Sequence, residues 1–287
     1  MSTAQDLLNV VRHAINPEAD VYGVLNEAIR AVGKRLYMLR SSIIISSLSV
    51  SVWAEVAATG SDIAFVDSDP DTITSTTTDF TDSDNLFVSG MHITTDAANA
   101  GPFKIDTVAA NTLTLISTDE LTAAAAGDSI TITSDNSYGD LPSDFWGLVS
   151  YPYLSGKTWN LKPLPSFAVD LAYSSAGIPV YYKIKGNRIY LTPVAGADYT
   201  VAGDYFAKPT EITTGTDIIP FSELLDDVIC EYVKQYFIAM NKGAAGTLLM
   251  PQYLRDEIDL VVSMRDKNSP YHNNKPNDCG VDWGGLN

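Results

Sequence analysis

The sequence predicts an α+β protein in which helices from both chain ends form one antiparallel bundle around β-rich segments. Apolar residues recur with helical spacing in the first forty residues and again between residues 223 and 266. Between about residues 50 and 135 the pattern instead alternates with a period of two residues, which is typical of strands. The chain has 287 residues, of which 45% are hydrophobic, so it is long enough for two hydrophobic cores.

Two amphipathic helices are predicted at the N-terminal end. The apolar face of the first consists of Leu7, Val10, Val11 and Ala14, and that of the second of Leu25, Ile29, Val32 and Leu36. Asn16 and Pro17 separate the two helices. Ser2 and Gln5 have the spacing of a capping box, and Asp20 can cap the second helix.

Residues 50–135 are predicted to form an inserted acidic β domain. They contain fourteen acidic residues and a single basic one, Lys104, and so supply most of the formal charge of −17. Alternation and turn residues predict five strands, over residues 63–66, 86–94, 103–108, 112–116 and 129–133. Five short strands favour a small barrel or sandwich.

The segment after residue 135 is predicted to combine ordered, aromatic-rich loops with a β-meander at about residues 178–208. Strands over 180–185 and 188–193 are joined at Gly186 and Asn187 as a tight hairpin. A third strand over 199–206 would complete the meander.

Two further helices follow. The first is expected to start at Ser222 and stop at Gly243, and the second to begin at Pro251. With the N-terminal pair they would build one helical-bundle domain from residues 1–49 and 136–266.

The last segment, residues 267–287, is rich in proline, glycine and asparagine and is predicted to be an extended tail that becomes ordered on a partner. Its candidate partner-binding residues are Tyr271, Trp283 and Leu286, because aromatic and large apolar anchors concentrate binding energy at interfaces.

No catalytic or cofactor-binding motif is recognisable, so we expect neither an enzyme nor a cofactor. His13, His92 and His272 lie in different regions without a partner at motif spacing, which favours structural or surface roles. Cys230 and Cys279 stand far apart and form no zinc or disulfide pattern. Cys230 is expected to be a small buried residue beside a helical apolar stripe.

The best metal candidate is a short acidic run. Asp67, Asp69 and Asp71 have the 1, 3, 5 spacing of a calcium loop. An EF-hand needs glycine at the sixth position and glutamate at the twelfth, where this chain has Thr72 and Thr78. A solvated turn is therefore favoured over an ion site, and no metal is assigned.

The charge balance bears on the partners. Lys and Arg number 18 against 35 Asp and Glu, and a surface of that sign repels phosphate and anionic lipid. Sequence-specific DNA binding and membrane association are disfavoured. Basic side chains gather near the N-terminal helices, where a solvated face and a partner surface both stay open: Arg12, Arg30, Lys34, Arg35 and Arg40.

Several strings, in their order along the chain, resemble the head-to-tail adaptor (connector or neck) proteins of tailed bacteriophages, particularly those of podovirus type. The strings are Leu141–Phe145, Asn187–Pro193, Asp198–Val201, Asp204–Pro209 and Ile219–Phe221, followed by the helix through Asn241–Gly243. The insertion separately resembles a β module of phage structural proteins, through Gly101–Val108, Thr112–Leu115 and Ala125–Asp128.

The resemblance implies a non-enzymatic virion protein of the neck, assembled in the cytoplasm of the bacterial host. Such proteins form a cyclic homo-oligomer, usually of about twelve copies, beneath the portal protein. The ring would join the portal of the DNA-filled head to tail nozzle, tail or fibre proteins and continue the DNA conduit. Genomic DNA would pass through without sequence-specific binding.

Two other functional classes stay open on the residues themselves. Trp, Tyr and acidic loops in and after the insertion would also suit a phage tail-associated protein that binds or cleaves glycans. A soluble enzyme with an unrecognised site is the third class.

Overall fold

The computed structural model describes residues 2–11, 21–83, 86–96, 99, 101–164, 176–221, 223–241 and 250–266. The chain divides into two compact units. The first comprises Met1–Leu48, Pro142–Tyr151 and Gly203–Asn287, and the second comprises Ser49–Leu141 and Pro152–Ala202. Within the described residues the fold is mixed α+β, with four α-helices and several antiparallel sheets, which confirms the predicted class.

The first unit contains the helices. Their bounds are α1 (Ala4–Val11), α2 (Val21–Met38), α3 (Asp226–Asn241) and α4 (Gln252–Asp266), with short 3-10 helices η2 (Ser42–Ile44) and η4 (Glu223–Leu225). The helix expected from Ser222 therefore begins with a 3-10 turn, and its α-helical part starts at Asp226. Asp226 and Asp227 suit that position because carboxylates are favoured at a helix N-terminus. Ser222 and Gly243, the predicted start and stop, lie outside the described residues.

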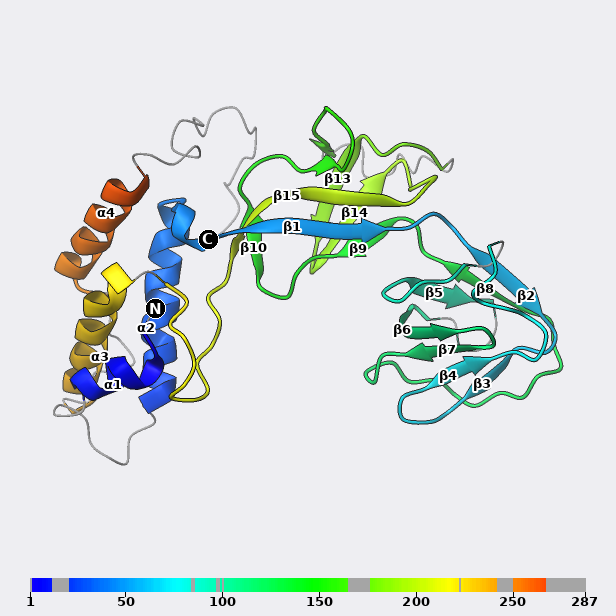
Figure 1. Ribbon diagram of the computed structural model, residues 1–287, viewed down its shortest axis with the longest axis horizontal. Helices are drawn as coiled ribbons and strands as arrows, with labels where there is room; N and C mark the ends of the chain where they lie inside the picture. The colour runs from blue at the N-terminus through cyan, green and yellow to red at the C-terminus, as the bar shows by residue number, and fades with distance from the viewer. Residues whose placement is uncertain are drawn as a thin grey trace. The chain divides into compact units, whose positions relative to one another are not determined.

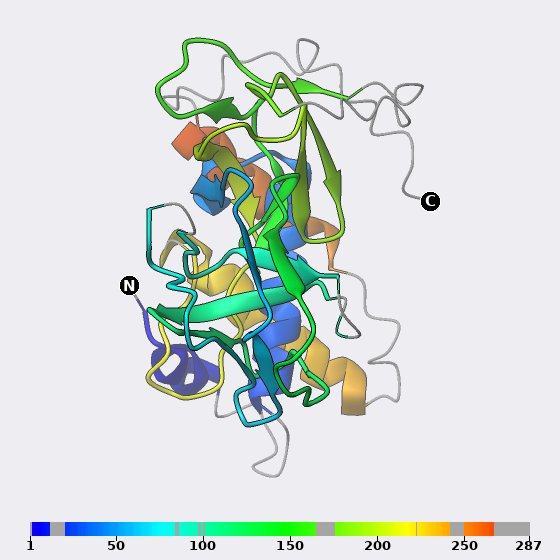
Figure 2. The ribbon, with the colours of Figure 1, turned by 90° about the vertical axis from the view of Figure 1, so that its right-hand side faces the viewer.

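Helices from the two ends of the chain share one hydrophobic core. Figures 1 and 2 show the blue α1 and α2 beside the gold and orange α3 and α4. Leu25, Ile29, Val32 and Leu36 of α2 are all at most 1% exposed, as the spacing predicted. They share the core with Val228, Ile229 and Val233 of α3 and with Leu254 and Ile258 of α4. The regular antiparallel bundle expected from the sequence stays a prediction.

The start of α1 lies one residue later than predicted. Thr3 and Asp6 form the capping box: the Asp6 N–H donates to Thr3 Oγ1 over 3.2 Å, and Asp6 Oδ2 accepts the Thr3 N–H over 2.9 Å. The predicted pair, Ser2 with Gln5, is therefore wrong. The Ser2 hydroxyl donates instead to the carboxylate of Asp226 at the start of α3.

The region predicted to be an insertion forms a seven-stranded sheet, whereas five strands were expected. Its order is β2-β8-β5-β6-β7-β4-β3. The bounds are β2 (Ala57–Gly60), β3 (Ala64–Val66), β4 (Thr72–Thr74), β5 (His92–Thr95), β6 (Phe103–Ala109), β7 (Thr112–Leu115) and β8 (Ile130–Ser134). The strand predicted over 86–94 starts only at His92, because Gly90 has a φ of 88° and a turn precedes the strand. Closure of this sheet into a barrel stays a prediction.

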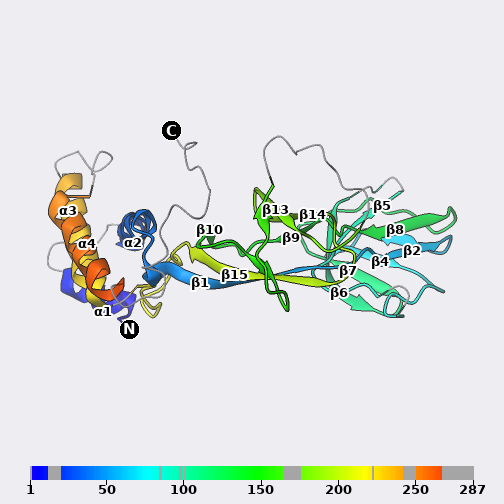
Figure 3. The same ribbon diagram turned by 90° about the horizontal axis from the view of Figure 1, so that it is seen from above.

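Two four-stranded sheets complete the chain. One has the order β12-β13-β14-β9, and the other has the order β1-β15-β10 with β11 also paired to β15. Figure 3 shows β9, β13 and β14 close together. The bounds are β1 (Ile45–Val52), β9 (Tyr138–Asp140), β10 (Phe145–Leu148), β11 (Tyr153–Leu154), β12 (Lys162–Pro163), β13 (Tyr181–Lys185), β14 (Arg188–Thr192) and β15 (Tyr199–Ala207).

The predicted hairpin is confirmed, but the predicted meander is wrong. β13 and β14 pair antiparallel across Gly186, whose φ of 60° suits a glycine in a tight turn. The third strand, β15, pairs with β1, β10 and β11 and not with β14. The reason is that the other edge of β14 is taken by β9, in register Arg188 with Asp140.

Gly139 in β9 permits a very close approach to β1. A Cβ atom at this position would lie 2.5 Å from Cγ1 of Val50 and 2.6 Å from the carbonyl oxygen of Ser51. No larger residue fits without a shift of the β1 backbone.

The division into units places residues 152–202, with the β13–β14 hairpin, together with residues 49–141. The sequence instead assigned the hairpin to the helical domain and 50–135 to a separate domain. Independent folding of residues 50–135 stays a prediction.

We expect a fragment of residues 50–135 to fold alone. The buried core of its sheet comes entirely from residues between Ala58 and Ile132, including Phe80, Phe87 and Leu113. An amide NMR spectrum of the fragment should be well dispersed, and circular dichroism should show β structure. Collapsed, random-coil amide shifts would contradict the boundary. A fragment of residues 50–120, which lacks β8, is the matched control and should be unfolded.

Candidate functional site

The three aspartates with the spacing of a calcium loop have different environments in the structure. Asp71 is 5% exposed, and its carboxylate accepts backbone N–H groups of Ser68 and Leu121. Asp67 and Asp69 are exposed. Among the residues that the structure describes, no group of three or more His, Cys, Asp or Glu side chains could hold a metal ion.

Cys230 is buried, as predicted. It is 5% exposed in the helical core, and its thiol donates a long hydrogen bond to the carbonyl of Leu7. Burial raises the pKa of this thiol to about 11, so it is held as a thiol and is a weak nucleophile. Cys279 lies outside the described residues.

The structure gives one predicted structural histidine an unexpected environment. His92 is 7% exposed at the start of β5, and its Nε2 lies 2.9 Å from Oδ2 of Asp140 in β9. The two residues are 48 positions apart, so no local sequence motif indicates that they pair. His13 and His272 lie outside the described residues.

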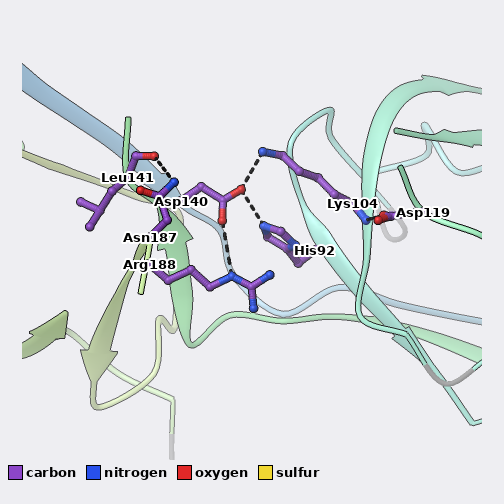
Figure 4. Close-up of polar contacts among 7 residues, drawn as sticks. All are labelled: His92, Lys104, Asp119, Asp140, Leu141, Asn187 and Arg188. Carbon is purple, nitrogen blue, oxygen red and sulfur yellow. Dashed lines mark hydrogen bonds and ion pairs between the residues drawn. The ribbon is translucent and has the colours of Figure 1, made fainter. Parts of the chain in front are cut away.

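Asp140 is the centre of a charged cluster built by four strands, which we call the Asp140 cluster: His92, Lys104, Asp140 and Arg188. Lys104 Nζ of β6 lies 2.6 Å from Asp140 Oδ2, and Arg188 Nε of β14 lies 3.6 Å from Oδ1. Figure 4 shows Lys104 and His92 meeting one carboxylate oxygen while Arg188 faces the other. The cluster therefore ties β5 and β6 of the seven-stranded sheet to the sheet of β9 and β14.

The environment sets the protonation state of the cluster. Burial lowers the pKa of His92 below its ordinary value of 6.5, although the hydrogen bond to Asp140 opposes this effect. Burial alone would raise the pKa of Asp140, but hydrogen bonds from Lys104 and His92 hold it below its ordinary value. At neutral pH a neutral His92 therefore donates its Nε2–H to an ionised Asp140.

Neighbouring contacts hold the side chains and the backbone around the cluster in place. The Arg188 guanidinium carbon lies 4.3 Å from the ring centroid of Tyr138, a cation–π contact. The side-chain amide of Asn187 donates to the carbonyl of Leu141 over 2.9 Å, next to Asp140, and the Lys104 N–H donates to Asp119. Both are visible in Figure 4.

A groove of about 610 Å³ lies over the Asp140 cluster. Lys104, Lys185 and Arg188 line it together with Asp119 and Asp140, so cations and carboxylates are nearly balanced. Its described lining contains no serine, threonine or cysteine that the His92–Asp140 pair could activate as a nucleophile. The ion pairs of the Asp140 cluster join strands on this groove.

The helical unit carries a second, more apolar groove of about 970 Å³. Ile218 and Leu224 line it and are 55% and 60% exposed. Glu211 and Asp217 add negative charge at its rim, and Arg265 near the end of α4 adds one cation. Exposed apolar side chains that gather in one groove, as these two do, are a feature of protein contact surfaces.

The partner-binding residues predicted from the sequence, Tyr271, Trp283 and Leu286, lie outside the described residues. The basic side chains of the N-terminal helices are partly paired within the subunit. Arg35 forms a bidentate ion pair with Asp259 of α4, and Arg30 pairs with Glu27 over 2.6 Å. Arg12 lies outside the described residues.

We expect Asp140→Ala to lower the free energy of unfolding by about 1–3 kcal/mol, because it leaves His92 without its hydrogen-bond partner and two cations without their counter-charge. Urea unfolding at pH 7 measures the change. Asp106→Ala, which removes an exposed carboxylate from β6, is the matched control and should change the free energy by less than about 0.5 kcal/mol. Equal losses in the two variants would contradict a special role for Asp140.

Comparison with known proteins identifies the family of the chain. The family model described as SU10 adaptor protein matches residues 108–267, which is more than half of the chain and begins within the predicted insertion. No curated protein matches the sequence. None of the described helices has the length and apolar character needed to cross a membrane. The protein therefore belongs to the SU10 adaptor protein family, which are phage head-to-tail adaptors.

Proposed function

We propose that the protein is a structural part of the virion neck that forms a ring and connects the portal of the DNA-filled head to the tail. The family match carries this proposal. The helical unit supports it, because apolar side chains such as Ile218, Leu224 and Leu260 are more than half exposed there. Exposing apolar side chains to water is unfavourable, and a partner or a second copy that covers them removes this unfavourable free energy.

The charge of the chain suits a DNA conduit. Duplex DNA must slide through during ejection, and lysine or arginine contacts to phosphate would retain it. A formal charge of −17 supplies weak repulsion instead. We accordingly propose passage of DNA without sequence-specific binding.

The proposal includes no enzymatic activity. This part of the proposal is supported by the Asp140 cluster, in which the side chains of His92, Lys104 and Arg188 all contact Asp140 and so join strands. The podovirus type, the phage-type origin of the inserted β segment and assembly in the host cytoplasm belong to the same proposal and rest on the sequence resemblance.

Ring formation is the central expectation. The purified protein, alone or mixed with the portal protein of the same virus, should give a closed ring of about twelve copies by native mass spectrometry and negative-stain electron microscopy. An acidic protein of unrelated fold and similar size, mixed with the same portal, is the control and should not attach. A protein that stays monomeric or trimeric with portal present and binds glycans saturably would instead support the glycan-binding alternative.

The C-terminal segment should contribute to portal attachment. Removing residues 267–287, which lie outside the described residues, should leave the helical unit folded and weaken attachment. Trp283→Ala should reproduce part of the loss, about 2 kcal/mol for a buried aromatic anchor, and Asn274→Ala in the same segment should not. The measurement is portal affinity by interferometry. Unchanged affinity of the truncated protein would assign the contact to the helical unit.

A further inference from the structure

Helix α2 presents a stripe of exposed side chains, which we call the α2 stripe: Arg30, Lys34 and Met38. All three are exposed, and Met38 is 73% exposed. Their spacing of four residues places them on one side of the helix. The stripe is basic in its first half and apolar at its end.

Helix α4 presents a second stripe, the α4 stripe: Asp256, Glu257, Leu260 and Met264. All four are exposed, with Leu260 at 57% and Met264 at 56%. Asp256, Leu260 and Met264 have the same spacing of four residues as the α2 stripe. This stripe is acidic in its first half and apolar at its end.

Inside one subunit Arg30 pairs with Glu27 and Glu211. The hydrogen bond to Asp259 and the charge of Asp256 raise the pKa of Arg35 on α2. Within the described part of the chain, Lys34 and Glu257 are therefore the charged members of the two stripes that are left for a second copy. Within the helical unit α2 contacts α4 through Arg35 and Asp259, with Arg35 Nε 2.8 Å from Asp259 Oδ1. Consecutive helical residues are rotated by about 100° around the axis, so Lys34 lies on a different side of α2 from Arg35, and Glu257 on a different side of α4 from Asp259. Among the described residues, no ion pair of the subunit involves Lys34 or Glu257.

The stripes match each other in charge, polarity and length when the helices run parallel. Arg30 then lies level with Asp256, and Met38 lies level with Met264. Lys34 lies within reach of Glu257 and packs its aliphatic stem on Leu260. An antiparallel pairing would instead set the basic residues of α2 against Leu260 and Met264.

We propose that the α2 stripe of one subunit packs in parallel against the α4 stripe of a second copy of this chain. The pairing rests on the ring proposed above and specifies its contact. Because each subunit offers two different stripes, the contact is heterologous, and its repetition around an axis produces a closed ring.

The charges provide the test. In the full-length protein, Lys34→Glu and Glu257→Lys each place like charges opposite each other. Each variant should therefore need at least about tenfold more protein for half-maximal ring formation than the wild type, measured by mass photometry or light scattering. The double variant restores opposite charges and should form rings like the wild type.

Mixing the two single variants is the sharper measurement. Where the variants alternate around a ring, the glutamate introduced by Lys34→Glu faces the lysine introduced by Glu257→Lys. At every second contact, the native Lys34 of one variant faces the native Glu257 of the other, so opposite charges meet throughout. An equimolar mixture should form rings at the wild-type concentration, although neither variant does so alone. Lys183→Glu and Glu120→Lys make the same charge changes at exposed positions of the second unit and should leave ring formation unchanged.

The outcomes separate the pairing from the ring. Wild-type rings together with unaffected single variants would overturn the pairing alone. Single variants that fail and are not rescued by mixing or by the double variant would also overturn it. Absence of wild-type rings, even with portal present, would overturn the proposed function and the pairing with it. Circular dichroism spectra like that of the wild type show that the variants are folded.

Discussion

The burial of α2 against α3 is the constraint on which the rest of the chain depends. Leu25, Ile29 and Val32 are inaccessible in a core that they share with Val228, Ile229 and Val233, about two hundred residues later in the chain. Each such side chain contributes about 1.5–3 kcal/mol when fully buried. The segments that form the second unit, residues 49–141 and 152–202, therefore lie in the sequence between parts of the helical unit. After the second unit, the chain packs closely on α2 at Gly33, where a Cβ atom would lie 2.9 Å from Cγ of Pro209.

The helices and the tight hairpin could be predicted from the sequence because their signals are local. The helical spacing of Leu25, Ile29, Val32 and Leu36 identified the buried face of α2, and Gly186 with Asn187 identified the turn between β13 and β14. The partner of β15 could not be predicted in this way. Its pairing with β1 and β10 depends on which strand edges are available. The edge of β14 is occupied by β9, a strand of only three residues.

The Asp140 cluster could not be predicted from the sequence either, because it also depends on which strands lie side by side. His92 lies opposite Lys104 in β5 and β6, and Asp140 lies opposite Arg188 in β9 and β14, but other strands separate the two pairs along the chain, and no sequence spacing links them. One signal was visible: Lys104 is the only basic residue between residues 50 and 135. A lone cation in so acidic a segment indicates a specific partner. The acidic run at Asp67–Asp71, by contrast, had a recognisable spacing, yet the structure uses Asp71 to bind backbone N–H groups.

The engagement of Lys104 by Asp140 has a colloidal consequence. With its lone cation, Lys104, bound to Asp140 over 2.6 Å, the segment of residues 50–135 presents carboxylates to solvent without a free cation to attract another copy. Such segments behave as like-charged particles that keep their distance over the Debye length, about 8 Å at physiological ionic strength. Two copies of the protein would thus repel each other wherever these segments face one another. Polyamines or divalent cations, which screen carboxylates strongly, would weaken this repulsion.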